Sequence, residues 1–240
     1  MQTDLLRTVT RRLFLDRQAA FWLERLHPTW SPHELRARVV EVITETPDAR
    51  TFVLRPNRHW AGHRAGQHVN LGIEIDGVRL TRSYSLTAPA RADGLLPITV
   101  KAIEGGKVSR HLCHDARMGD IVDLGQAFGE MTLPALPRGA FLLLAAGSGI
   151  TPLMALVRDL AGQGMPADTT LLYWVRRRGE ACFVDELRAL AAAHPGFRFR
   201  LLLTREAAQA ADEAEGRIDD ALLGAHAGDL SARQVMACGP

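Results

Sequence analysis

Hydrophobic and polar residues follow different spacings in successive parts of the chain. Residues 1–27 place apolar side chains at steps of three and four among several arginines, which predicts an amphipathic helix that ends at His27-Pro28. We expect this helix to form an N-terminal extension, residues 1–34, that packs on the following domain. The alternative is a basic amphipathic helix that makes peripheral contact with a membrane or touches a partner.

From residue 35 to 135 the spacing changes to two, which is typical of half-buried strands. Turn dipeptides such as Asp76-Gly77 and Gly105-Gly106 separate the strands, and one helix is expected at 108–117. Six short strands at this spacing predict a small closed β-barrel. The predicted strands cover residues 36–46, 50–55, 68–75, 78–86, 96–103 and 120–127.

After the linker-like segment 133–139, buried-strand runs alternate with helices. Alternation of this kind predicts a parallel sheet built from βαβ units. The strands are expected at 141–146, 170–176, 197–204 and 234–238, and the helices at 151–162, 185–193 and 218–223. The predicted fold therefore has two domains, a β-barrel over 35–135 and an α/β Rossmann-like domain over 140–240.

Composition narrows the class of protein. The 240 residues are 47% hydrophobic and 23% charged, as in ordinary folded proteins, and the net charge of +2 gives no reason to expect a nucleic-acid partner. The sequence has neither a run of 18 apolar residues nor the pattern of a signal peptide, so we expect a cytoplasmic protein. The spacing of Cys113, Cys182 and Cys238 fits no iron–sulfur or zinc site, so no metal site is expected.

A glycine-rich turn between strand 141–146 and the next helix is the strongest candidate binding site. Its glycines let the backbone approach a pyrophosphate, and the start of the helix attracts negative charge. The turn lacks both the third glycine of the usual dinucleotide fingerprint and the lysine of a P-loop. The alternative is that this glycine turn binds no ligand. The residues of the candidate site are Gly147, Ser148, Gly149, Ile150, Thr151 and Pro152.

Two segments of the barrel half give weaker signals. Strand alternation puts Arg82 and Tyr84 on one face, a pairing of guanidinium and flat ring that suits a flavin nucleotide. The turn at 105–109 offers glycines, a helix start and the Ser109 hydroxyl to an anion. Each segment also has a purely structural interpretation, as a barrel strand or a helix cap. The arginine–tyrosine strand, the turn at 105–109 and the later glycine turn at 147–152 follow one another along the chain. Together they imply two anionic ligands, one in each domain.

These motifs resemble the ferredoxin-NADP reductase superfamily of flavin-dependent electron-transfer enzymes. The resemblance covers roughly residues 35–240 and implies a six-stranded antiparallel barrel that binds FAD, followed by a domain that binds NAD(P)H. It rests on four motifs in sequence order, Arg82 to Ser85, Gly106 to Ser109, Gly147 to Pro152, and Cys238 to Pro240.

The resemblance also implies roles for residues of the barrel. Arg82 would pair with the FAD pyrophosphate, Tyr84 would lie against the flavin, and Ser85 would approach flavin N5. The turn before the helix would hold the FAD phosphates, with the Ser109 side chain as a donor. The residues of that turn are Gly106, Lys107, Val108 and Ser109.

In the nucleotide domain, the resemblance implies that the turn from Gly147 to Pro152 holds the pyridine-nucleotide pyrophosphate. It places Cys238 near nicotinamide C4, which makes Ser85 and Cys238 the candidate catalytic residues. Arg176 and Arg177 follow the second strand, where the family contacts the adenosine ribose. A guanidinium there suits a 2′-phosphate, whereas an NAD site usually presents a carboxylate.

Arg205, at the end of the third strand of that domain, is a candidate to join the arginine cluster. NADPH is therefore favoured over NADH as electron donor, and a solvated basic loop is the alternative. The predicted activity is reduction of FAD by NADPH, followed by electron transfer to a ferredoxin-type iron–sulfur centre or another one-electron acceptor. An NADH-dependent oxygenase reductase and a flavin relay subunit without nucleotide turnover are alternatives.

The family continues beyond its Cys-Gly-Pro motif, so we expect this chain to be incomplete at its C-terminus. Any [2Fe-2S] cluster would then lie in the missing segment. Leu26 to Trp30 resembles a subgroup that serves membrane-bound fatty-acyl desaturases. The expected partners are therefore a ferredoxin-type domain or protein and either a desaturase or an oxygenase.

Overall fold

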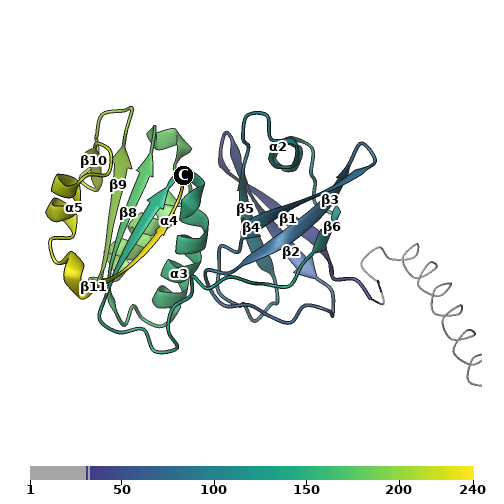
Figure 1. Ribbon diagram of the computed structural model, residues 1–240, viewed down its shortest axis with the longest axis horizontal. Coiled ribbons are helices and arrows are strands. Elements are labelled where there is room, and N and C mark those ends of the chain that lie inside the picture. The colour runs from purple at the N-terminus through teal and green to yellow at the C-terminus, as the bar shows by residue number, and fades with distance from the viewer. Residues whose placement is uncertain (1–30, 32) are drawn as a thin grey trace, which may run out of the picture.

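The computed structural model describes residue 31 and residues 33–240, so the predicted N-terminal helix lies outside the described residues. Two lobes stand side by side, each built on its own sheet, and the chain passes once from the first lobe to the second (Figure 1). Among the described residues, no helix combines the length and apolar character needed to span a bilayer.

The first lobe is a six-stranded antiparallel barrel with strand order β4-β3-β6-β1-β2-β5. Alternating side chains such as Ala37 and Val39 of β1 point into a core that also contains Phe52, Leu71 and Ile98. One helix, α2 (Lys107–His114), packs on β3, β4 and β5. The strands are β1 (Arg36–Thr46), β2 (Ala49–Pro56), β3 (His68–Ile75), β4 (Val78–Ser85), β5 (Leu96–Lys101) and β6 (Ile121–Leu124).

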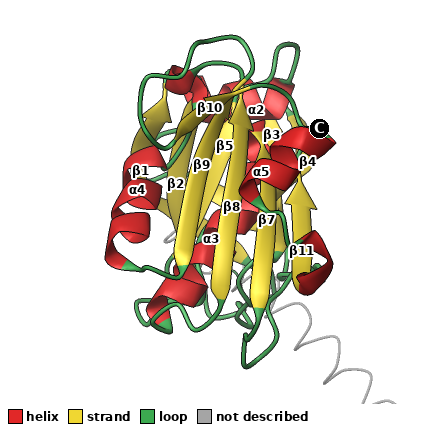
Figure 2. Ribbon diagram, turned by 90° about the vertical axis from the view of Figure 1, so that its left-hand side faces the viewer, coloured by secondary structure: helices red, strands yellow, loops and turns green. Residues whose placement is uncertain are grey.

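The second lobe is a five-stranded parallel sheet with strand order β10-β9-β8-β7-β11. Helices α3 and α4 cover one face of the sheet, and α5 covers the other (Figures 1 and 2). The strands are β7 (Ala140–Ala146), β8 (Asp168–Val175), β9 (Phe197–Leu203), β10 (Glu213–Glu215) and β11 (Arg233–Cys238), and the helices are α3 (Ile150–Gly162), α4 (Val184–Ala193) and α5 (Asp220–His226).

Alternation along β7 explains the two covered faces. Phe141 and Leu143 are fully buried on the side of α3, whereas Leu142 belongs to the cluster on the side of α5. Because both faces are covered, the strand is apolar at nearly every position. The predicted two-domain fold, an antiparallel barrel followed by a Rossmann-like parallel sheet, is confirmed.

Helix α3 lies between the parallel sheet and the barrel (Figure 1). Its Arg158 donates from Nη1 to the carbonyl oxygen of Thr87 in the barrel lobe at 2.6 Å. The same guanidinium pairs with Glu186 of α4 and lies over the Phe183 ring, 5.1 Å from the ring centroid. One side chain therefore ties α3 and α4 to the barrel.

The strand and helix ends differ from the sequence prediction by a few residues. The sixth barrel strand ends at Leu124 rather than residue 127, because the pairing with β3 shifts by one residue after Gly125 and resumes only as an isolated bridge between His68 and Phe128. Helix α5 begins at Asp220 rather than 218, because the Asp219 carboxylate caps it by accepting from the Leu222 amide at 2.7 Å. Strand β10 was not predicted, since its three residues are too few to show a period.

Candidate functional site

The glycine-rich turn connects β7 to α3, as the sequence predicts, and its two outer glycines are required for different reasons. Gly147 adopts a φ of 53°, in the left-handed region that favours glycine. Gly149 has an ordinary φ of −62°, but a Cβ there would lie 2.0 Å from the carbonyl oxygen of Cys238. The end of β11 therefore packs directly on the turn.

Within this turn, only part of the predicted binding segment faces open space. Gly147 and Ser148 line a cavity. Ile150, Thr151 and Pro152 are buried at the start of α3, and the Thr151 hydroxyl donates to the carbonyl oxygen of Ser148 at 2.9 Å. Ile150, Thr151 and Pro152 therefore support the turn from its buried side. The backbone of Gly147 and Ser148 is available to a ligand.

The cavity has a volume of about 920 Å³ and lies at the carboxyl ends of β7, β8, β9 and β11. This edge of a parallel sheet is where such folds bind their ligands. The barrel contributes Lys101 at the end of β5, so the cavity lies where the two lobes meet. Other residues that line it include Ala146, Trp174, Glu180, Thr204, Arg217, Ile218, Cys238 and Pro240.

Two of the predicted arginines line this cavity. The amide of Arg205 donates to the carbonyl oxygen of Arg176 at 2.9 Å, so the two residues stand beside each other just beyond the ends of β8 and β9. The Arg176 guanidinium pairs with Glu180 at 2.9 Å. Arg177 is exposed, but it is not among the residues that line the cavity. A cavity that has the backbone of a glycine turn on one side and arginines at its edge fits the phosphates of a pyridine dinucleotide.

Sequence reasoning missed several residues of the cavity. Lys101 pairs with Asp48 at 3.0 Å and lies 3.8 Å from Glu180, so a line of alternating charges runs from the barrel to Arg176. Arg217 adds a further cation on the opposite lobe. Lys101 and Glu180 come from segments about 80 residues apart, and no local pattern joins them.

Cys238 ends β11 inside the cavity and is half-buried. Burial raises the pKa of its thiol, so the sulfur is uncharged at neutral pH. An uncharged thiol suits contact with a flat, weakly polar ring better than it suits nucleophilic attack.

On the flavin side, Arg82 and Tyr84 share one face of β4, and Ser83 and Ser85 share the other. The register pairs Tyr84 with Val69 and Arg82 with Leu71, whereas the Ser83 hydroxyl donates to Asn70 Oδ1 at 2.7 Å. Burial raises the pKa of Tyr84 to about 12, against the opposing effect of Arg82. The phenol therefore keeps its proton and can donate a hydrogen bond.

The second glycine turn lies before α2, which packs against β4. Gly105 has a φ of 72°, and the amide of Gly106 donates to the carbonyl oxygen of Ile103 at 2.9 Å. Ser109 is buried, and its Oγ accepts from the amide of Ile103 at 3.2 Å. The hydroxyl therefore braces the turn from within, and its contact with FAD stays a prediction.

Lys107 is exposed at the first position of α2, while Val108 is buried against the barrel core. Arg82 is exposed on the neighbouring strand. A guanidinium, a protonated phenol and a glycine turn that opens a helix fit the phosphates and ring of an FAD.

Two family models match the chain in succession. A model for an oxidoreductase FAD-binding domain matches residues 36–132, and a model for an oxidoreductase NAD-binding domain matches residues 143–240. The fold and the cavity thus define a two-domain flavin- and pyridine-nucleotide-binding oxidoreductase. The chain belongs to the ferredoxin-NADP reductase superfamily.

Similar proteins include reductases of several systems. The NADPH oxidoreductase of Mycobacterium tuberculosis is 36% identical over 223 residues, which cover 91% of this chain and 57% of the relative. The ferredoxin reductase component of a 3-ketosteroid-9-alpha-monooxygenase from Mycolicibacterium smegmatis is 34% identical over 215 residues, covering 87% and 58%. The chain therefore spans less than two thirds of these relatives.

A solved structure supports the fold. The ferredoxin NADP⁺ reductase from Neisseria gonorrhoeae, with bound FAD and NADP, superposes with a TM-score of 0.71 at 24% identity, over 85% of each chain.

Proposed function

We propose that this chain is the FAD- and nucleotide-binding part of a reductase that transfers electrons from NADPH, through FAD, to a ferredoxin-type iron–sulfur centre or another one-electron acceptor. The observation that supports this best is the cavity between the lobes, which brings Lys101 of the barrel together with Gly147 and Cys238 of the parallel sheet. A nucleotide bound there reaches the lobe that has the flavin-binding motifs.

Bound FAD would supply the chemistry that accepts a hydride and releases electrons singly, while the protein supplies binding and orientation. The exposed Arg82 would neutralise the pyrophosphate, and the half-buried Tyr84 would present its ring and its O–H donor to the cofactor. Ser85, the next residue on the strand, would orient the reactive edge of the flavin. The turn from Gly106 to Ser109 would bind the phosphates through its backbone.

On the other side of the boundary, Gly147 and Ser148 would receive the nucleotide pyrophosphate. The uncharged Cys238 thiol would pack beside the nicotinamide and exclude water from it. Since Gly149 contacts the backbone of Cys238, the turn that holds the phosphates also fixes the residue beside the reacting ring.

The preference for NADPH would come from Arg176 and Arg205, which stand together at the edge of the cavity. A guanidinium forms paired, charge-assisted hydrogen bonds with a phosphate, each worth about 1.5–3 kcal/mol. Arg176→Ala should therefore raise the KM for NADPH about tenfold or more and change the KM for NADH little.

Arg198→Ala is the matched control for this experiment, because Arg198 pairs with Asp168 at the amino ends of the strands, far from the cavity. Equal changes in the two KM values of Arg176→Ala would overturn the 2′-phosphate role.

A second candidate is an NADH-dependent reductase component of an oxygenase system. It is favoured by relatives such as the NADH oxidoreductase HCR of Escherichia coli, 33% identical over 205 residues, and the monooxygenase reductase component described above. The same steady-state comparison of NADPH with NADH separates the two candidates. An oxygenase or a ferredoxin-type protein is accordingly the proposed partner, and the desaturase partner stays a prediction.

A further inference from the structure

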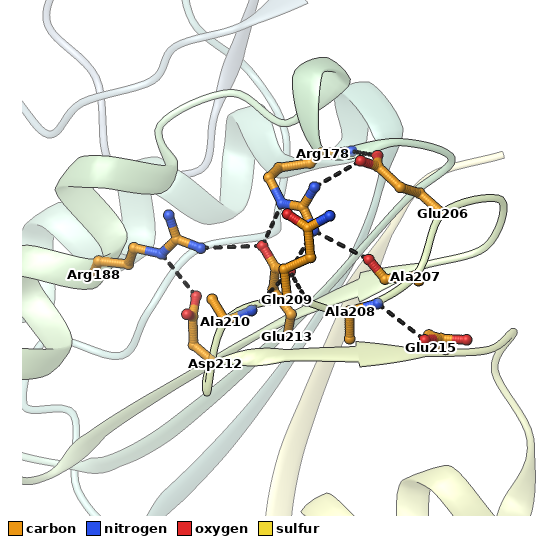
Figure 3. A network of polar contacts seen from close by, with 10 residues as sticks. All are labelled: Arg178, Arg188, Glu206, Ala207, Ala208, Gln209, Ala210, Asp212, Glu213 and Glu215. Carbon is orange, nitrogen blue, oxygen red and sulfur yellow. Dashed lines mark hydrogen bonds and ion pairs between the residues drawn. The ribbon is translucent and has the colours of Figure 1, made fainter.

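Arg178 is the third of three consecutive arginines, yet it does not line the cavity, and its side chain enters a network of polar contacts (Figure 3). Its Nη1 donates to Glu206 Oε1 at 2.6 Å, and its Nε and Nη2 donate to the two oxygens of Glu213 at 2.7 and 2.6 Å. Nη2 also donates to the carbonyl oxygen of Ala207 at 3.2 Å. Every nitrogen of the guanidinium is engaged.

Glu213 is the centre of this network. Its side chain is fully buried, and it also accepts from Arg188 Nη2 at 3.3 Å and from the amides of Gln209 and Ala210 at 2.8 and 3.2 Å. Hydrogen bonds from Arg178 and these amides hold the pKa of the carboxyl at about 2. A buried carboxylate with this many donors fixes the loop around it.

The network joins two loops that carry the arginines of the cavity. Arg178 lies two residues after Arg176 on the loop that follows β8, and Glu206 lies one residue after Arg205 on the loop that follows β9. Glu206 also accepts from the backbone amide of Arg178 through Oε2 at 2.7 Å. The backbone hydrogen bond from Arg205 to Arg176 joins the two loops where the strands end, and the contacts between Arg178 and Glu206 brace the same two loops one and two residues further on.

We propose that Arg178 is a positioning residue for the 2′-phosphate subsite formed by Arg176 and Arg205. This inference rests on the proposed preference for NADPH. With its charge paired to two carboxylates, Arg178 does not contact the phosphate; it braces the two loops from which Arg176 and Arg205 extend their side chains toward it. We call the contacts between Arg178 and Glu206 the clamp. Small displacements of binding groups have large effects on affinity, so loosening the clamp weakens recognition of the 2′-phosphate.

The test compares two ligands that differ only in that phosphate, adenosine 2′,5′-bisphosphate and adenosine 5′-monophosphate. Titration calorimetry on the FAD-loaded protein measures both dissociation constants. Arg178→Lys keeps the positive charge but loses the forked contact, and Glu206→Gln keeps the shape and removes the negative charge. Arg198→Gln, which removes an arginine–carboxylate pair at the opposite end of the sheet, is the control.

We expect both clamp variants to bind the bisphosphate about tenfold more weakly and to bind the monophosphate within about twofold of wild type, which would show that the folded site is retained. If either clamp variant loses affinity equally for both ligands, or keeps the wild-type ratio, the inference is overturned while the proposed function stands. A wild-type protein that binds the two ligands equally overturns the proposed preference for NADPH and the inference with it.

Discussion

Replacing Gly149 with alanine would force the phosphate-binding turn and the end of β11 apart. The new Cβ would lie 2.0 Å from the carbonyl oxygen of Cys238, 2.4 Å from its carbonyl carbon and 2.7 Å from the amide nitrogen of Gly239. All three are backbone atoms, which cannot rotate aside as a side chain can. Relief of the overlap therefore requires the last residues of β11 to move by about 1 Å or more, since carbon atoms attract each other best at about 3.5–4 Å.

The energetic cost follows from the same geometry. Overpacking a close-packed interior destabilises a protein by about 1–3 kcal/mol, and a clash with rigid backbone belongs at the upper end of that range. The functional cost is larger, because a misplacement of about 1 Å in the groups that position the reactants can slow a reaction by about 100-fold. Gly149→Ala should therefore lower the rate of flavin reduction at saturating NADPH about 100-fold, through displacement of Cys238.

Gly147→Ala is the matched control. A Cβ at this position meets no atom within 4 Å, and the cost comes from its φ of 53°, about 1–2 kcal/mol for a residue other than glycine. Gly147 lines the cavity, so we expect the substitution to weaken nucleotide binding and to leave the rate at saturation close to that of wild type. Anaerobic stopped-flow bleaching of the flavin measures both quantities. Indistinguishable behaviour of the two variants would refute the assignment of different roles to the two glycines.

Three further predictions concern the flavin, the lobe boundary and pH. Arg82→Gln should weaken FAD binding about tenfold or more in a fluorescence titration, because a charge-assisted contact to phosphate is lost; unchanged affinity would exclude that contact. Arg158→Met should destabilise the protein by about 2 kcal/mol in urea unfolding, since the carbonyl oxygen of Thr87 loses a charged donor at 2.6 Å; an unchanged midpoint would contradict this. The pKa of Glu213 is lowered from 4.5 to about 2 by hydrogen bonds from Arg178, so its stabilising effect should be complete above pH 4.5 and should fade as the pH falls toward 2. The stability difference between wild type and Glu213→Gln should shrink over that interval, and a constant difference would be contrary to this account.

Local patterns were sufficient to predict most of the architecture. Alternation at spacing two predicted the barrel strands, and it is clearest at the start of β1, where buried and less buried side chains alternate, whereas β5 is buried at nearly every position. The apolar run from Phe141 to Ala146 predicts a strand covered on both faces, and the structure has helices on both. The glycine turn was found because its residue types reflect a backbone requirement that operates within a few residues.

The arginine cluster shows where sequence reasoning stops. Arg176, Arg177 and Arg178 are chemically equivalent in the sequence, but only Arg176 lines the cavity. What distinguishes Arg178 is its contact with Glu206 and Glu213, which follow 28 and 35 residues later in the chain. Such pairing depends on how β8, β9 and β10 are brought together, and no local pattern encodes it.

Lys101 was missed for a related reason. It stands at the end of a barrel strand with no glycine, helix start or repeated charge beside it. Its place in the cavity arises from the packing of one lobe on the other. Residues that act across a domain boundary therefore need the assembled structure to identify them.

The most direct test of the central claim is anaerobic reduction of the FAD-loaded protein by NADPH and by NADH, followed through the loss of flavin absorbance. The account predicts rapid bleaching by NADPH, at a rate severalfold above that with NADH at equal subsaturating concentrations, because Arg176 and Arg205 favour the 2′-phosphate. A yellow protein that neither nucleotide bleaches would contradict nucleotide-dependent reduction. Equal or faster bleaching by NADH would contradict the assignment of NADPH as the electron donor.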